Sequence, residues 1–205
     1  MGGFKHLLNS MEKLRQTPSQ TVGPFFAYGL TAVQYKYDYT SIITGSLMSD
    51  NFVANRILIS GRVYDGSGNP ISDAMIECWQ ADGAGYYNKM INFPHDGFMG
   101  FGRLGTGTDP DQAFQFTTIK PGSTGKNQAP HINIILFMRG SLRHLYTRMY
   151  FSDEEKANQS DELLCSVPEE RRNTLIGKLF QKDGITEYLF DIHMQGEKET
   201  IFFEI

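Results

Sequence analysis

Three polar side chains that could do chemistry stand in the longest apolar run of the chain, at His131, Asn133 and Arg139. An imidazole can ligate a metal or transfer a proton, and a guanidinium binds carboxylates. Because side chains on a strand alternate with a period of two, all three would project from one face of an extended segment. At ~3.3 Å per residue, Arg139 would lie about 26 Å from His131. One small-molecule site therefore cannot use both ends of this segment.

The residues around these three positions indicate a buried strand. The run from 128 to 140 is rich in Ile and Phe, with Pro130 near one end and an Arg-Gly pair at the other. This length and these boundaries favour a strand over a helix. The opposite face would carry Ile132, Ile134, Leu136 and Met138 toward a core.

No familiar catalytic motif surrounds the histidines. No spacing typical of paired metal ligands occurs among the other four, His6, His95, His144 and His193. The chain also lacks a zinc-protease motif, a nucleophile-elbow motif and a cluster of Cys and His. Residue types alone therefore predict only a hydrogen-bonded histidine at a strand end.

A glycine pattern at 100–105 matches G-x-G-x-x-G, but its surroundings do not suit a dinucleotide site. Such a site needs a strand before the pattern and a helix opening at its last glycine. We interpret the pattern as a tight loop, within a glycine-rich connection over 83–113, that buries Arg103 against the sheet.

Composition narrows the class of protein. The chain has 205 residues and a net charge of -4, which gives no reason to expect a nucleic-acid or membrane surface. Cys78 and Cys165 form no metal-type pair, so we expect reduced, buried thiols in a cytoplasmic protein. No apolar run approaches the length of a membrane span.

The elements that must position these residues are mostly strands. Alternating or apolar segments bounded by turn residues predict strands over 56–65, 74–79, 114–119, 131–139, 145–151, 186–193 and 200–205. Two short helices are expected between them, with Ser152 and Ser166 as caps. The prolines of 17–26 predict an extended arm, and 31–55 reads as a loop.

We expect an all-β fold, a β-sandwich of antiparallel strands with an extended N-terminal arm and short helices in loops. The predicted organisation is an arm and connection over 1–55 and one sandwich domain over 56–205.

Several of these stretches occur together in one known family. The segments 79–82, 85–87, 101–103, 118–122 and 129–132 resemble, in order, the landmarks of the intradiol ring-cleaving dioxygenases. The segments 17–24, 136–140 and 195–203 resemble the α-type chains of that family, which pair with an iron-bearing β-type chain. The similarity extends from residue 17 to residue 205.

The resemblance implies a ligand set for ferric, non-haem iron of two tyrosines and two histidines. Tyr87 matches the first tyrosine and His131 the first histidine, but Asn133 stands in place of the second histidine. The segment 121–124 has no tyrosine where the family carries one. Ferric iron prefers anionic oxygen donors, which an amide and a hydroxyl replace poorly. We therefore expect no iron in this chain, with Tyr87 and His131 as hydrogen-bonded relics and Fe3+ on the partner.

The resemblance also implies that this chain lends residues to the partner's substrate pocket. Arg139 matches an arginine that faces that pocket, where a guanidinium suits an anionic aromatic acid. Thr21 and Pro24 match arm residues of the same pocket, and Phe25 stands where relatives often carry tyrosine. The expected substrates are an aromatic dihydroxy acid and O2, and the expected assembly is a hetero-oligomeric oxidoreductase whose present chain is inactive alone.

Two alternatives remain open from the sequence. The chain could be a structural or binding sandwich that has lost dioxygenase chemistry, or a stand-alone dioxygenase that recruits metal through Tyr87, His131 and a nonstandard ligand.

Overall fold

Strand β5 (His131–Phe137) forms from the apolar run and pairs on both sides, with β2 (Met75–Gln80) and β6 (Leu145–Phe151). The computed structural model describes residues 17–23, 25–88 and 97–204. Within β5 the predicted alternation is confirmed, since Ile132, Ile134 and Leu136 are fully buried in the main core. The face that carries His131 and Asn133 therefore points away from that core.

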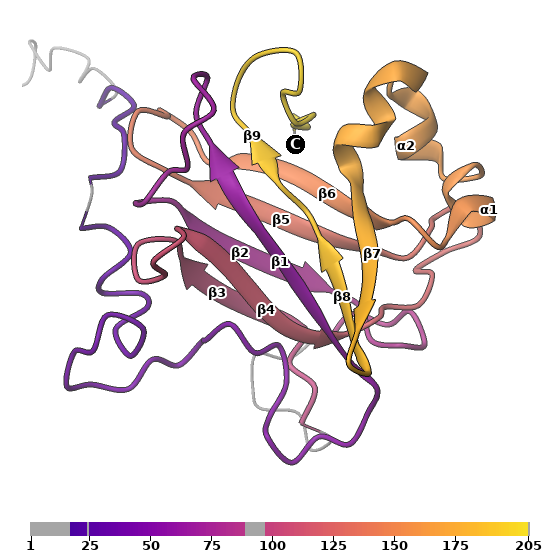
Figure 1. Cartoon of the computed structure of the whole chain (residues 1–205), viewed down its shortest axis with the longest axis horizontal. Coiled ribbons are helices and arrows are strands. Elements are labelled where there is room, and N and C mark those ends of the chain that lie inside the picture. Colours follow the sequence, from indigo (N-terminus) through magenta and orange to yellow (C-terminus); the bar gives the residue numbers. More distant parts are fainter. Residues whose placement is uncertain (1–16, 24, 89–96, 205) are drawn as a thin grey trace, which may run out of the picture.

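The described strands form one continuous sheet that folds back on itself. The strand order is β3-β2-β5-β6-β7-β8-β1-β4, and β9 pairs with β1. Figure 1 shows the half with β1 and β8 in front of the half with β2 and β5. The main core draws apolar side chains from both halves, so the predicted all-β sandwich is confirmed. The remaining strands are β1 (Arg56–Tyr64), β3 (Phe101–Gly105), β4 (Ala113–Ile119), β7 (Ile176–Lys182), β8 (Ile185–Leu189) and β9 (Ile192–His193).

The expectation of purely antiparallel strands is wrong at three pairs. Strands β6 and β7, β1 and β8, and β1 and β9 pair in parallel. The helical segment between β6 and β7 explains the first case, because a crossover returns the chain in the same direction whereas a hairpin reverses it.

Two strands lie where the sequence predicted none. Strand β3 crosses the expected 83–113 loop, and β7 follows the helices. The glycines of β3 hid it from a pattern search, yet they serve packing: a Cβ on Gly102 would stand 2.5 Å from Leu47 Cδ1. Arg103 lies within β3 and pairs with Glu77 of β2 at 2.6 Å, with its side chain 20% exposed, so the predicted tight loop and the full burial of Arg103 are both wrong.

The C-terminal strand is also a correction. The segment 200–204 forms only an isolated bridge, between Phe203 and Tyr146, in place of the predicted strand over 200–205. The predicted strand over 186–193 is interrupted, since Phe190 and Asp191 separate β8 from β9.

The short helices exist, but their predicted caps are wrong. The chain forms α1 (Glu155–Asn158), α2 (Glu162–Ser166) and a 3-10 segment, η1 (Glu169–Leu175). The Ser152 hydroxyl accepts from the backbone N–H of Leu179 on β7, and the Ser166 hydroxyl donates to the Leu163 carbonyl. Both side chains therefore bond groups outside the predicted capping motifs, and neither caps a helix.

Asp161 is the cap that the sequence did not reveal. Its buried carboxylate accepts hydrogen bonds from the N–H of Leu164 in α2, the hydroxyl of Tyr150 on β6 and the N–H of Ala129 just before β5. One carboxylate thereby joins α2 to the two strands that carry the polar face.

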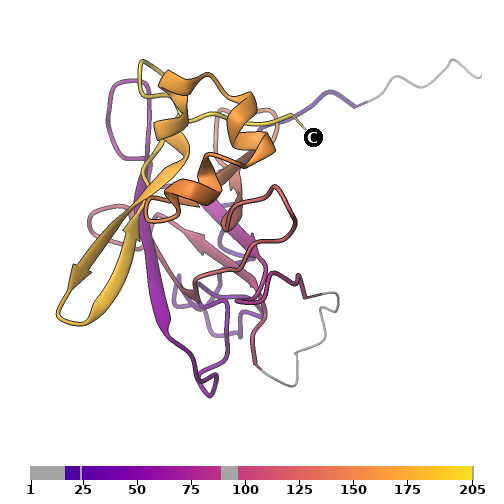
Figure 2. The same cartoon turned by 90° about the vertical axis from the view of Figure 1, so that its right-hand side faces the viewer.

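The segments before β1 pack on the sheet. The Leu47 N–H donates to the Thr117 carbonyl of β4, and the Leu47 side chain is fully buried. Figure 2 shows the arm (indigo) leaving the sheet near the C-terminal segment. No helix among the described residues is long and apolar enough to cross a membrane. Both cysteines are free, but Cys165 is exposed, which corrects the expected burial of both.

Asp161→Ala should lower the free energy of unfolding by about 2–4 kcal/mol, because it removes a helix cap and leaves two further donors without a partner. Urea denaturation at pH 7 measures the change. Glu155→Ala, at an exposed position in the first turn of α1, is the control and should change it by less than about 0.5 kcal/mol. Equal effects from both variants would contradict the role of Asp161.

Candidate functional site

The outward face of β2, β5 and β6 carries a cluster of polar and aromatic side chains. The register places Asn133 of β5 between Trp79 of β2 and Arg148 of β6. His131 lies opposite Tyr150 of β6. The alternation that sends Ile132 and Ile134 into the core sends these side chains together to the other face. We call the set Tyr87, His131, Asn133, Tyr146 and Arg148 the polar cluster.

The hydrogen bonds of His131 define its protonation. Its Nδ1 lies 2.8 Å from the Ala129 carbonyl, which can only accept, so Nδ1 carries the proton. Its Nε2 then accepts from the Tyr87 hydroxyl at 3.2 Å. Burial, and then the nearby charge of Arg148, lower the pKa of His131, so the neutral imidazole is favoured.

Tyr87 is a neutral phenol in this setting. It donates to His131 and accepts from the Asn133 Nδ2 at 2.8 Å. Burial raises the pKa of Tyr87 above its usual value, which disfavours the phenolate. Its ring packs on Trp79 with centroids 4.7 Å apart. Trp79 is 45% exposed and lies at the edge of the cluster.

Asn133 uses both ends of its amide. Its Nδ2 donates to Tyr87, and more weakly to the Trp79 carbonyl at 3.3 Å. Its Oδ1 accepts from the Tyr146 hydroxyl at 2.6 Å and from the Arg148 Nε at 3.0 Å. The side chain is 3% exposed, so these four contacts replace water.

Arg148 and Tyr146 were missed by sequence reasoning. They belong to an alternating strand with no motif of its own, and only the register of β6 on β5 brings them to Asn133. Burial acts to lower the pKa of Arg148, but hydrogen bonds to Tyr150 and Tyr146 raise it. The guanidinium therefore stays charged inside the cluster.

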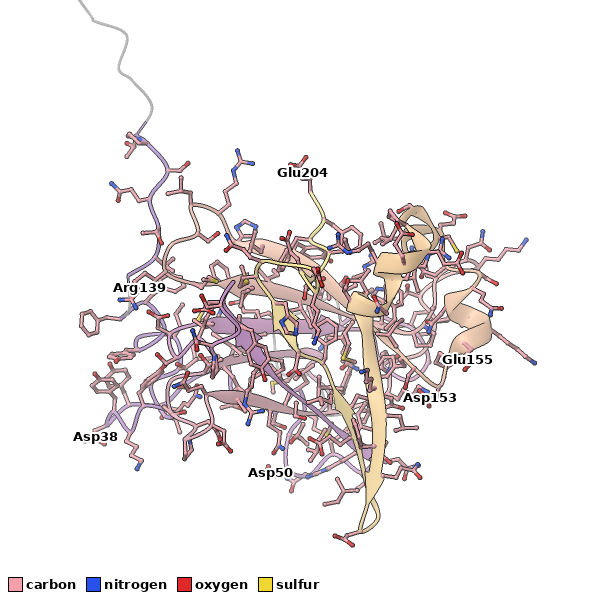
Figure 3. All side chains as sticks on the ribbon, turned by 45° about the horizontal axis from the view of Figure 1, so that its top comes forward. Asp38, Asp50, Arg139, Asp153, Glu155 and Glu204 are labelled. Carbon is pink, nitrogen blue, oxygen red and sulfur yellow. The ribbon has the colours of Figure 1, made fainter. Side chains whose placement is uncertain are left out.

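Arg139 lies beyond the other end of β5. Its Nε is 3.1 Å from Asp73 Oδ2, in an ion pair without hydrogen-bond geometry, and its side chain is 63% exposed. Figure 3 shows Arg139 beside the N-terminal arm, on the opposite side of the molecule from Asp153 and Glu155 near α1. His131 pairs with Tyr150, next to the segment that leads to α1, so the two ends of β5 form separate sites.

The arm reaches the Arg139 end of the strand. The backbone N–H of Gly140 donates to the Thr21 hydroxyl at 2.7 Å. Phe25 is 71% exposed and contacts Tyr28 edge to face, while Phe26 packs on Phe137 of β5. Thr21 and Arg139 are thus brought close in space by one contact between distant segments. Pro24 lies outside the described residues.

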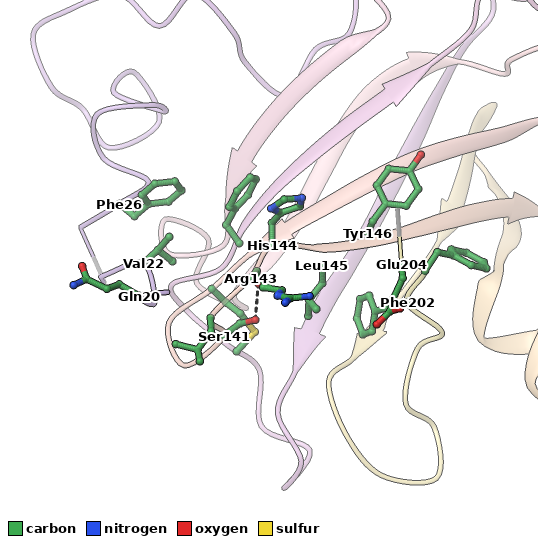
Figure 4. Close-up of a pocket in the computed structure, with 14 residues that line it drawn as sticks. Gln20, Val22, Phe26, Ser141, Arg143, His144, Leu145, Tyr146, Phe202 and Glu204 are labelled. Carbon is green, nitrogen blue, oxygen red and sulfur yellow. Dashed lines mark hydrogen bonds between the residues drawn. The ribbon is translucent and has the colours of Figure 1, made fainter. Parts of the chain in front are cut away.

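A cavity of about 690 Å³ opens between the arm and the C-terminal segment. Figure 4 shows Gln20, Val22 and Phe26 on one side and Phe202 and Glu204 on the other. Its lining is mainly apolar and includes His144 and Tyr146 of the β5–β6 region. Tyr146 both lines this cavity and bonds Asn133, so the cavity borders the polar cluster. Sequence patterns do not predict this cavity, because it forms between segments far apart in the chain.

Comparison with known proteins now identifies the family. A family model described as "Dioxygenase" matches residues 34–196. The chain is 47% identical over 197 residues to the protocatechuate 3,4-dioxygenase alpha chain of Burkholderia cepacia, covering 95% of this chain and 100% of that one. It is 42% identical to the corresponding alpha chain of Pseudomonas putida, over 95% and 98% of the two chains.

The chain belongs to the intradiol dioxygenase family.

Two further matches show how widely this relationship extends. The protocatechuate 3,4-dioxygenase beta chain of Burkholderia cepacia is 33% identical over 162 residues, covering 72% of this chain and 68% of that one. The solved dioxygenase domain of a carbohydrate-binding fusion protein from Streptomyces sp. SirexAA-E superposes with a TM-score of 0.59 at 23% identity, covering 86% and 97% of the chains. The second match supports the fold alone.

The cluster does not fit the ferric iron that intradiol dioxygenases use. Of the four ligands expected, only Tyr87 and His131 are present, and each is engaged in hydrogen bonds. Ser123 and Thr124, in the segment without a tyrosine, bond within their own loop to Gln128. No group of three or more His, Cys, Asp or Glu side chains in the described part of the chain could hold a metal ion.

Asn133→Leu should lower the free energy of unfolding by about 2–4 kcal/mol, because it leaves the Arg148, Tyr146 and Tyr87 groups without their buried partner. Urea denaturation measures the change, with the exposed Asn51→Leu as the control. A loss no larger than that of the control would show that the amide contacts are not structural.

Proposed function

We propose that this chain is the iron-free α-type subunit of a hetero-oligomeric protocatechuate 3,4-dioxygenase, and that a β-type chain holds the ferric iron. The observation that carries the proposal is the polar cluster, in which two of the four expected ligands are missing and the remaining two are occupied by hydrogen bonds. The similarity to alpha chains over nearly the whole chain, together with the match to a beta chain, supports the pairing.

In this proposal the complex opens the ring of protocatechuate with O2, between the two hydroxylated carbons, to give 3-carboxy-cis,cis-muconate. Ring opening takes place on the partner chain. The contribution of the present chain is to bind and orient the substrate's carboxylate, which the ring-opening chemistry does not consume. We divide it into an arm and connection over 1–55 and a dioxygenase-like domain over 56–205, and place the complex in the cytoplasm, which suits its free cysteines.

Arg139 is the residue we assign to the carboxylate. Its ion pair with Asp73 uses the Nε edge, and its two Nη groups have no hydrogen-bond partner among the described residues. An exposed guanidinium with free Nη groups can form a two-pronged contact with a carboxylate. Asp73 would meanwhile restrain the side chain, which limits the entropy lost on binding.

The arm completes this edge. The Thr21 hydroxyl accepts from Gly140, the residue after Arg139, which places the arm beside the guanidinium. The exposed Phe25 offers a ring without a hydroxyl, so it can contact the substrate or the partner only by apolar packing. Pro24, next to Phe25 in sequence, is assigned to the same edge.

The chain purified alone should be colourless, carry no stoichiometric iron and cleave no catechol, because its cluster lacks the donors that ferric iron needs. Co-expression with a β-type chain should give a coloured, active complex. Metal analysis and an oxygen-uptake assay measure both states. An isolated chain that holds stoichiometric iron and opens a catechol would contradict the proposal, and would favour the stand-alone alternative.

Arg139→Ala in the assembled complex should raise KM for protocatechuate by roughly 10–100-fold, the effect of losing a charge-assisted contact. Catechol, which has no carboxylate, should be affected little, and the iron content should not change. Steady-state kinetics with both substrates measures the difference. Arg62→Ala is the matched control, because the partly exposed Arg62 side chain also lies near an aspartate, at 3.8 Å from Asp111. Lost iron with unchanged kinetics would contradict the assigned role.

A further inference from the structure

Arg148 is a half-buried cation that has no acidic ion-pair partner among the residues the structure describes. It lies on β6 with Asn133 as its cross-strand neighbour, and its Nε donates to the Asn133 Oδ1 at 3.0 Å. In the described part of the chain it forms no ion pair, unlike Arg62, Arg103 and Arg139. Charged groups withdrawn from water are usually paired, so an unpaired guanidinium among neutral oxygens needs an explanation.

The explanation begins with the lone pairs that a metal ion would require. The Nε2 of His131 accepts from Tyr87, the oxygen of Tyr87 accepts from Asn133, and the Oδ1 of Asn133 accepts from Arg148 and Tyr146. The hydrogen bonds therefore run in one direction, from Arg148 through Asn133 and Tyr87 to His131. Arg148 is the first donor in this series of hydrogen bonds and carries the only formal positive charge in the polar cluster.

A metal ion entering the cluster would meet two obstacles. It would have to displace the hydrogen-bond donor from each of these lone pairs. Its charge would also lie close to the guanidinium of Arg148, and like charges repel strongly outside bulk water.

We propose that Arg148 is a built-in substitute for the metal ion, whose guanidinium supplies the positive charge of the cluster and keeps metal out. Loss of the second histidine and the second tyrosine is then only part of the reason why this chain is iron-free. Asn133→His alone should not restore metal binding, because the cation remains. Asn133→His combined with Arg148→Gln should restore it, through Tyr87, His131 and the introduced imidazole. Glutamine keeps a polar group beside Tyr146 and removes the charge.

The test compares four forms of the full-length chain: Asn133→His, Arg148→Gln, the two together, and Asn133→His with Arg143→Gln. Arg143 is exposed on the connection between β5 and β6 and takes no part in the cluster's hydrogen bonds, so its substitution controls for loss of one positive charge nearby. Each form is exposed to ferric iron, freed of unbound metal and assayed for iron content and for the visible absorption of a phenolate bound to ferric iron. Thermal unfolding of each form without iron verifies folding.

The combination of Asn133→His with Arg148→Gln should retain at least roughly ten times as much iron as Asn133→His alone or as the control pair. Of the four forms, only this combination should show the absorption band. As a second measurement, a complex of this combination with a β-type chain should hold about twice the iron per pair of chains that the unsubstituted complex holds. These readouts do not depend on dioxygenase activity. A failure of the proposed function would appear as iron in the unsubstituted chain, which is a different result.

Two outcomes would overturn the inference. In one, Asn133→His alone, or with Arg143→Gln, takes up as much iron as the combination with Arg148→Gln. In the other, that combination folds, with and without the partner, and takes up none.

Discussion

The hydrogen bond from Arg148 to Asn133 is the interaction on which the rest of the polar face depends. It orients the Asn133 amide, since a guanidinium can only donate and so draws Oδ1 toward β6. The Nδ2 group is thereby turned toward Tyr87, which directs the Tyr87 hydroxyl proton to the Nε2 of His131. His131 in turn holds its other proton on the Ala129 carbonyl. Reversing the amide would set donor against donor at Arg148 and acceptor against acceptor at Tyr87 and the Trp79 carbonyl.

The network also connects the site to the fold. Ala129, which accepts from His131, donates its own N–H to the buried carboxylate of Asp161. The same carboxylate caps α2 and bonds Tyr150, which lies next to the cluster on β6. Polar groups on three elements are thus satisfied without a metal, which explains how a chain of a metalloenzyme family keeps the family fold while its donor set does not suit iron.

The two ends of β5 divide the roles of the chain. At one end the polar groups are buried or half-buried and bond one another, as suits a structural cluster. At the other end Arg139 is exposed, is restrained by Asp73 and is accompanied by the arm through Thr21. An exposed, oriented cation is suited to binding an anion from outside the chain, and a closed network is not.

Local patterns determined much of this protein. Alternation in β1, β5 and β6, and the apolar runs of β2 and β4, were sufficient to predict a β-rich fold, since a period of two depends only on neighbours in sequence. The absence of a second histidine and a second tyrosine is likewise a property of residue types.

Tertiary structure decided what those absences mean. Several contacts join residues that are far apart in sequence and therefore have no local signal. They are the hydrogen bonds from Arg148 to Asn133, from Leu179 to Ser152 and from Gly140 to Thr21, the contacts of Asp161 with β5 and β6, and the parallel strand pairs. Register and packing bring them together, because a strand's neighbours are chosen by the burial of the whole core and not by the strand's own sequence.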